Sequence, residues 1–153
     1  MNESQELPPP VLANPVINIR DRVDSGGGGG GASCSMHMPG EGTGTTALMV
    51  MRTGDCAGLA PRFWEINSFA SATTILLTQN KDGTKTNASF WIELKTTRQM
   101  AALSDEEVVA LNAYAKNDFI EHGIGVMVVD KHGTIARDQL GSIRVTTSAA
   151  APA

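Results

Sequence analysis

Beyond residue 44 the chain repeatedly alternates apolar with polar residues, the period of two that is typical of strands with one buried face. Residues 62–69 (RFWEINSF) alternate in this way, residues 45–52 (TTALMVMR) form a further β-run, and residues 72–79 (ATTILLTQ) favour a strand because Thr73, Thr74 and Ile75 are β-branched. Residues 80–83 (NKDG) are a hairpin turn signal. The return strand predicted over residues 84–95 places Phe90, Ile92 and Leu94 on one face. Together these runs predict an antiparallel sheet.

One segment has the spacing of a helix instead. Ser104 and Glu107 match a capping box, in which both side chains satisfy backbone N–H groups at the start of a helix. Apolar residues then recur three or four positions apart, at Val108, Leu111, Ala115 and Phe119. Gly123 is a natural helix stop, so the pattern predicts one helix near residues 105–122.

Further strands are predicted after this helix, at residues 126–129, 134–136 and 142–147. Because strands and helices do not alternate as βαβ units, we expect an α+β fold that is mainly β. Its body is a compact antiparallel sheet or sandwich of about six strands and one helix. We assign this body to residues 45–147, and the small residues at 148–153 to a flexible tail.

Residues 1–25 predict an extended N-terminal arm. Pro8, Pro9 and Pro10 stiffen it into a polyproline-like rod. Residues 16–23 alternate like a strand, and its apolar positions are Val16, Ile17, Ile19 and Val23. A lone strand ahead of a flexible segment has no local partner. We therefore expect it to pair with a sheet of a neighbouring subunit by β-strand addition.

Residues 26–44 predict a flexible tether, because six consecutive glycines begin it and a second Gly-rich stretch at residues 40–44 ends it. A phosphate-binding loop is the sharper alternative, but that loop needs a helix after it and usually a lysine. The residues after the glycines contain neither a GK[ST] triplet nor a helical pattern. The tether is the preferred interpretation.

Charge and hydropathy argue against several partners. The 153 residues have a formal net charge of −4, and their 12 basic residues are scattered, which is untypical of proteins that bind nucleic acid or anionic membranes. No apolar run reaches the roughly 20 residues of a membrane span. The N-terminus lacks the basic and apolar regions of a secretory signal. We expect synthesis in a reducing cytoplasm, with neither nucleic acid nor membrane as a partner.

Cys34, His37 and Cys56 allow two further interpretations. With Met36 and Met38 they form a cluster of soft donors suited to zinc or copper, although the four ligands of a closed structural site are incomplete. Alternatively, Cys34 and Cys56 form a disulfide. A reducing compartment favours two free thiols. Oxidation after the protein has left the cell would instead allow the disulfide to form, so both interpretations are kept. We expect no metal and no other cofactor.

Catalytic chemistry has weak support. No nucleophile motif such as G-x-S-x-G occurs, and the three histidines are far apart in the chain. Glu65 and Glu93, each near a tryptophan on a predicted strand, resemble the carboxylate pair of a glycosidase. Glutamates on the solvent side of strands are far commoner. We predict no catalytic residue.

A low charge and a high content of Gly, Thr and Ala suit surfaces that neighbouring subunits cover. We predict a non-enzymatic structural subunit of a large homo-oligomeric assembly. The proposed setting is a tailed-phage virion, where the chain would decorate the capsid or serve in the neck, tail or baseplate. Its partners would be copies of itself and other structural subunits. The alternative is a soluble small-molecule-binding or sensory α+β module, with the turn near Asp130 lining a pocket.

Overall fold

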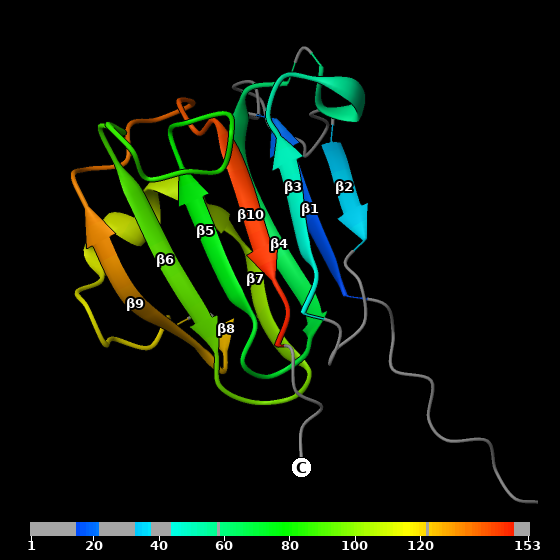
Figure 1. Cartoon of the computed structure of the whole chain (residues 1–153), viewed down its shortest axis with the longest axis vertical. Helices are drawn as coiled ribbons and strands as arrows, with labels where there is room; N and C mark the ends of the chain where they lie inside the picture. Colours follow the sequence, from blue (N-terminus) through cyan, green and yellow to red (C-terminus); the bar gives the residue numbers. More distant parts are fainter. Residues whose placement is uncertain (1–14, 22–32, 38–43, 58, 122, 149–153) are drawn as a thin grey trace, which may run out of the picture.

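A computed structural model describes residues 15–21, 33–37, 44–57, 59–121 and 123–148 of the chain. These residues form a sandwich of two five-stranded sheets, and the paired strands are antiparallel (Figure 1). The predicted fold class, α+β and mainly β with a compact antiparallel body, is confirmed.

Sheet A has the strand order β2-β1-β4-β7-β8 and sheet B the order β3-β10-β5-β6-β9. Sheet A consists of β1 (Val16–Asp21), β2 (Ser33–His37), β4 (Pro61–Phe69), β7 (Ala101–Glu107) and β8 (Gly123–Ile124). Sheet B consists of β3 (Thr46–Val50), β5 (Thr74–Thr78), β6 (Trp91–Thr96), β9 (Val126–His132) and β10 (Ser142–Thr146). The connections include two short 3-10 helices, η1 (Gly54–Cys56) and η2 (Val108–Ala113).

Alternate residues of both sheets meet in one apolar core. Sheet A contributes Ile17, Ile19, Trp64, Ile66 and Leu103. Sheet B contributes Ile75, Leu77, Ile92, Leu94, Ile143 and Val145. Two sheets that face each other bury every second residue of each strand. This packing is the physical reason for the period of two in the sequence.

β1 lies inside sheet A, which corrects the prediction of a strand that joins a neighbouring subunit. It pairs with β2 on one side and with β4 on the other. Both edges of the strand are therefore used within the chain, and Ile17 and Ile19 are fully buried in its own core. Val16 also pairs with both neighbours. The other predicted arm residues, Pro8, Pro9, Pro10 and Val23, lie outside the described residues.

The body therefore begins before residue 45, where the sequence placed its start. Residues 33–37, assigned to the tether, form β2 and pair with β1 in register from Val16–His37 to Arg20–Ser33. β2 supplies the partner that β1 seemed to lack. The glycine run, residues 26–31, lies outside the described residues. Residues 149–153 of the predicted tail also lie outside them.

The helix predicted near residues 105–122 is much shorter. Strand β7 continues to Glu107, and only η2 is helical, with Val108 and Leu111 buried. Within β7, Leu103 is buried while Ser104 is exposed, as in a strand of a half-buried sheet. Pairing with β4 overrides the capping box, because helix propensity is weak against tertiary contacts. Within the described part of the chain, no helix has the length and hydrophobicity to span a membrane.

Candidate interaction edge

β3 is the outermost strand of sheet B, with β10 on one side and no strand of the described chain on the other (Figure 1). The backbone N–H of Met51 donates to Gly141 O at 2.9 Å, and the N–H of Thr147 donates to Thr45 O at 3.0 Å. Residues 45, 47, 49 and 51 are therefore the ones whose backbone groups face β10.

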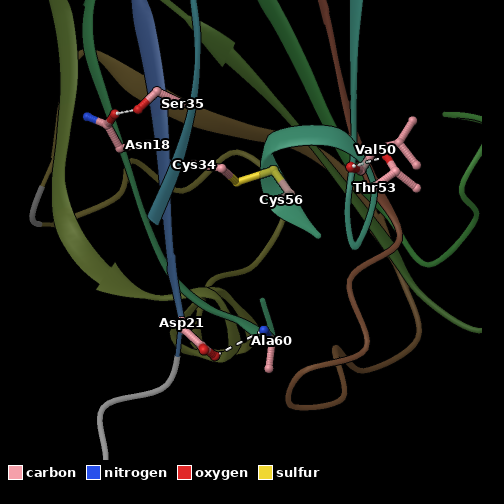
Figure 2. The surroundings of a disulfide bond; sticks show 8 residues. All are labelled: Asn18, Asp21, Cys34, Ser35, Val50, Thr53, Cys56 and Ala60. Atoms are coloured by element: carbon pink, nitrogen blue, oxygen red, sulfur yellow. Dashed lines mark hydrogen bonds between the residues drawn. A yellow bond between two sulfur atoms is a disulfide. The ribbon is translucent and has the colours of Figure 1, made fainter. Parts of the chain in front are cut away.

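In an antiparallel pair the intervening residues direct their backbone groups away from the partner strand. Those residues in β3 are Thr46, Leu48 and Val50. Their N–H and C=O groups face outward, and we call this row the open edge. The Val50 carbonyl also accepts a hydrogen bond from Thr53 Oγ1 at 3.1 Å, which shapes the end of the strand (Figure 2).

The chemistry of β3 suits pairing with another strand. Its sequence, TALMV, contains no charge and no proline, and its register with β10 runs without a bulge. Charges, prolines and bulges are the devices that keep an exposed edge from pairing with other chains. β2, the edge strand of sheet A on the same side, is more polar, with Ser33, Ser35 and His37.

The two faces of β3 differ in burial. Met49 is buried in the core, while Leu48 on the outer face is 40% exposed. The loop between β5 and β6 lies close to Leu48 at Gly83, where an added Cβ would come within 2.7 Å of Leu48 Cδ1. Gly83 also has a φ of +72°, a conformation that glycine adopts without strain. Leu48 is thus held from one side by this loop and open to solvent on the other.

A disulfide between Cys34 and Cys56 braces this side of the sandwich (Figure 2). Its S–S distance is 2.10 Å, and both cysteines are buried. Cys34 belongs to β2 and Cys56 to η1, which follows β3 in the chain. The bond therefore ties the segment after the outermost strand of sheet B to the outermost strand of sheet A.

This bond decides between the interpretations of the two cysteines. The prediction of two free thiols is wrong. A zinc or copper site built on Cys34, His37 and Cys56 is also excluded, because disulfide sulfurs do not supply the thiolates that such a site needs. Among the described residues, no group of three or more His, Cys, Asp or Glu side chains could hold a metal ion.

The glutamates considered as a catalytic pair lie on different sheets. Glu65, on β4 of sheet A, accepts a hydrogen bond from Asn18 Nδ2 at 2.8 Å. Glu93, on β6 of sheet B, forms an ion pair with Lys85 at 2.9 Å. The structure does not bring the two carboxylates together, and each has a structural partner of its own.

The opposite end of sheet B is covered by the chain itself. Residues 117–120 run along the outer side of β9, where Asn117 N–H donates to Val128 O at 2.8 Å and Val128 N–H donates to Asp118 O at 2.9 Å. Ile120 N–H donates to Val126 O at 3.0 Å. We call this row the covered edge. The carbonyl of Val126 and both backbone groups of Val128 are satisfied within the chain.

Two ionised contacts fasten the loops around the sandwich. Arg62 Nε and Nη2 donate to the Asp138 carboxylate at 2.8 and 2.7 Å, and this bond raises the pKa of Arg62. The Asp82 carboxylate accepts from Thr84 Oγ1 at 2.6 Å, which lowers the pKa of Asp82. Both contacts stabilise connections between strands, and the second holds the loop that approaches Leu48.

Sequence reasoning missed the open edge, although a signal was present. Residues 45–51 contain no charged residue, and β3 falls within them. What the sequence does not show is that this strand ends a sheet. The predicted interaction residues Val16, Ile17 and Ile19 lie in an inner strand instead.

Comparison with known proteins gives no relative. No protein-family model matches the chain, and neither a curated protein nor a solved structure matches it significantly.

Proposed function

We propose that this protein is a non-enzymatic structural subunit of a large homo-oligomeric assembly, and that this assembly is the virion of a tailed phage. In the particle the chain would decorate the capsid or belong to the neck, tail or baseplate. Its partners would be copies of itself and other structural subunits, bound through strand addition rather than through nucleic acid or membrane.

The open edge of β3 is the observation that carries this proposal. Thr46, Leu48 and Val50 present outward backbone donors and acceptors on a strand without charge. Exposed edges of this kind are templates for pairing with another chain, and soluble proteins usually protect them. β9, at the other end of the same sheet, is covered at Val126 and Val128, so within sheet B the two edges differ.

The disulfide supports the proposed setting. Disulfides persist in oxidising surroundings, such as those outside a cell, and are rare in proteins that remain in the cytosol. Cys34 and Cys56 brace the side of the sandwich that carries the open edge. In a particle component that leaves its host, this disulfide would remain oxidised.

The test is the native mass of the full chain in solution, measured by light scattering after size exclusion and by electron microscopy. We expect assemblies of many copies whose population rises with protein concentration. A single chain of 16.1 kDa at every concentration up to the millimolar range would contradict the proposal.

A small-molecule-binding module is the second candidate, and one hollow favours it. This hollow, about 380 Å³ in volume, is lined by Ala113, Tyr114, Asp118, Phe119 and Glu121. Lys131, beside Asp130 in β9, donates to Tyr114 O at 2.6 Å and so reaches this region. This candidate predicts a monomer or dimer that binds a small molecule saturably, and a Phe119→Ala variant that loses this binding.

A further inference from the structure

We infer that the open edge binds β3 of a second copy of this chain, antiparallel about a two-fold axis, with Leu48 opposite Leu48. This inference rests on the proposed function and specifies the partner, the strand and the register. The pairing of the two β3 strands would join the two copies of sheet B into one continuous sheet. Such a contact uses the same surface on both chains and closes on itself, so larger assemblies need a second contact elsewhere.

The backbone supports this register. Thr46, Leu48 and Val50 face outward, so the pairs 46–50, 48–48 and 50–46 bring outward groups of one copy opposite outward groups of the other. Each such pair in an antiparallel sheet exchanges two N–H···O bonds, which gives about six bonds for the three pairs. Shifting either strand by one residue would place inward-directed groups opposite outward ones.

The side chains fit the same register. On the outer face Leu48 meets Leu48, and Thr46 meets Val50 as a pair of β-branched residues, which favour strand pairing. On the inner face Ala47 comes opposite Met49, and both pack against the core in each copy. No charge is placed opposite a like charge, because β3 carries none.

The two ends of the chain are poorer occupants of this edge. Residues 1–14 contain Pro8, Pro9 and Pro10, and Pro15 follows at once. Proline has no N–H to donate to a sheet, so only residues 11–14 separate these interruptions. Residues 149–153 (AAAPA) are short and also contain a proline. β3 itself is an uncharged, proline-free end strand that a second copy offers with unused backbone groups, and it is less polar than the other five-residue end strand, β2.

Cysteine cross-linking of the full chain tests the register. Residues directly opposite in a hydrogen-bonded pair have Cα atoms about 5.5 Å apart, within the range of a disulfide. We expect Leu48→Cys to form covalent dimers under mild oxidation. We expect a mixture of Thr46→Cys and Val50→Cys chains to cross-link at least tenfold more than either variant alone. Lys95→Cys, on β6 of the same sheet and exposed, is the control that stays uncrosslinked.

A matched pair of charge variants tests the contact without added cysteines. Leu48 and Phe119 are both exposed apolar side chains, 40% and 57% exposed, on the open and covered sides. We expect Leu48→Lys to weaken association at least tenfold and Phe119→Lys to leave it unchanged. Circular dichroism and the retained Cys34–Cys56 bond report that both variants fold.

The outcomes separate this inference from the proposed function. If the wild-type chain assembles but Leu48→Cys does not cross-link, or Leu48→Lys assembles normally, the β3 contact is wrong while the structural role stands. If wild-type protein stays a single chain at every concentration, both are wrong. Cross-linking at Leu48 together with loss of association in Leu48→Lys supports the inference.

Discussion

The two ends of sheet B are built in opposite ways. At β9 the chain returns along the edge: Asn117 and Ile120 donate to the carbonyls of Val128 and Val126, and Asp118 accepts from the N–H of Val128. β9 also carries Asp130 and Lys131, and its register with β6 is interrupted by a bulge. At β3 none of these devices is present among the described residues: the strand is uncharged, regular and without an outer partner.

The difference shows that, of the two edges of sheet B, the chain covers one and leaves the other without an outer partner among the described residues. An exposed, regular and uncharged edge strand promotes association with other chains. Soluble proteins usually prevent this association with charges, prolines or bulges at the edge, or with a segment that covers it. The disulfide adds to the contrast, because it braces the open side and not the covered one. A strand held in a fixed position loses less conformational entropy when it binds. We therefore interpret the open edge as a prepared binding surface.

The largest effect is expected from removing β1, which lies between β2 and β4 in sheet A. Deleting residues 1–25 removes Ile17 and Ile19, each worth about 1.5–3 kcal/mol of burial, and takes the sheet partner from β2. Against a typical stability of about 5–15 kcal/mol, the chain should fail to fold. Deleting only residues 1–14 is the control and should leave the melting temperature unchanged. A sharp melting transition in the longer deletion would contradict the placement of β1.

The next effect is expected from the disulfide. Replacing Cys34 and Cys56 together by alanine opens a loop with a sequence separation of 22 residues and should cost about 3 kcal/mol of unfolding free energy. Denaturant unfolding measures this loss. Amide exchange should accelerate more at Ala47 and Met49 than at Val128, since the brace acts on the open side. Equal acceleration at both edges would show that the bond stabilises the sandwich as a whole.

A smaller effect is expected from loosening the covered edge. Asp118 Oδ2 accepts the Ala115 N–H at 2.8 Å and shapes the turn that covers β9. Asp118→Ala should cost about 1 kcal/mol and accelerate exchange of the Val128 amide, whereas Asp118→Asn keeps an acceptor and should stay near wild type. The Leu48 amide should be unaffected in both variants. If Val128 remains fully protected, residues 117–120 are not what covers this edge.

The smallest effect on stability is expected at the open edge itself. Because Leu48 points outward and is 40% exposed, Leu48→Lys should change the unfolding free energy by no more than about 0.5 kcal/mol. Thermal and denaturant unfolding of dilute protein measure this change. A loss of several kcal/mol would mean that Leu48 is a core residue, and its effect on association would then have another cause.

Much of the fold follows from the period of two, and the failures have identifiable causes. The strands predicted at residues 45–52, 62–69 and 72–79 lie close to β3, β4 and β5, because alternation in the second and β-prone composition in the other two are local signals. The segment at 104–107 favours a helix locally but forms β7, since β4 offers it a long pairing partner. Local propensity does not contain that information.

The candidate site was harder to predict than the fold. Strand order is a property of distant contacts: β10 is the last strand in the chain, yet it lies between β3 and β5. Whether a strand is inner or outermost therefore follows only from the whole sheet. For this reason the sequence pattern predicts β1 as the interaction strand and does not distinguish β3 from the inner strands. The Cys34–Cys56 bond was weighed on compartment alone, whereas the fold brings the two Cα atoms to 5.2 Å.

Amide hydrogen exchange as a function of protein concentration tests the central claim most directly. In dilute protein the amides of Thr46 and Leu48 should exchange rapidly, while Ala47 and Met49, bonded to β10, and Val128, bonded to Asp118, should be protected. At high concentration Thr46, Leu48 and Val50 should become protected together, and Val128 should not change. If Thr46 and Leu48 still exchange rapidly in fully assembled protein, the open edge of β3 is not the contact between subunits.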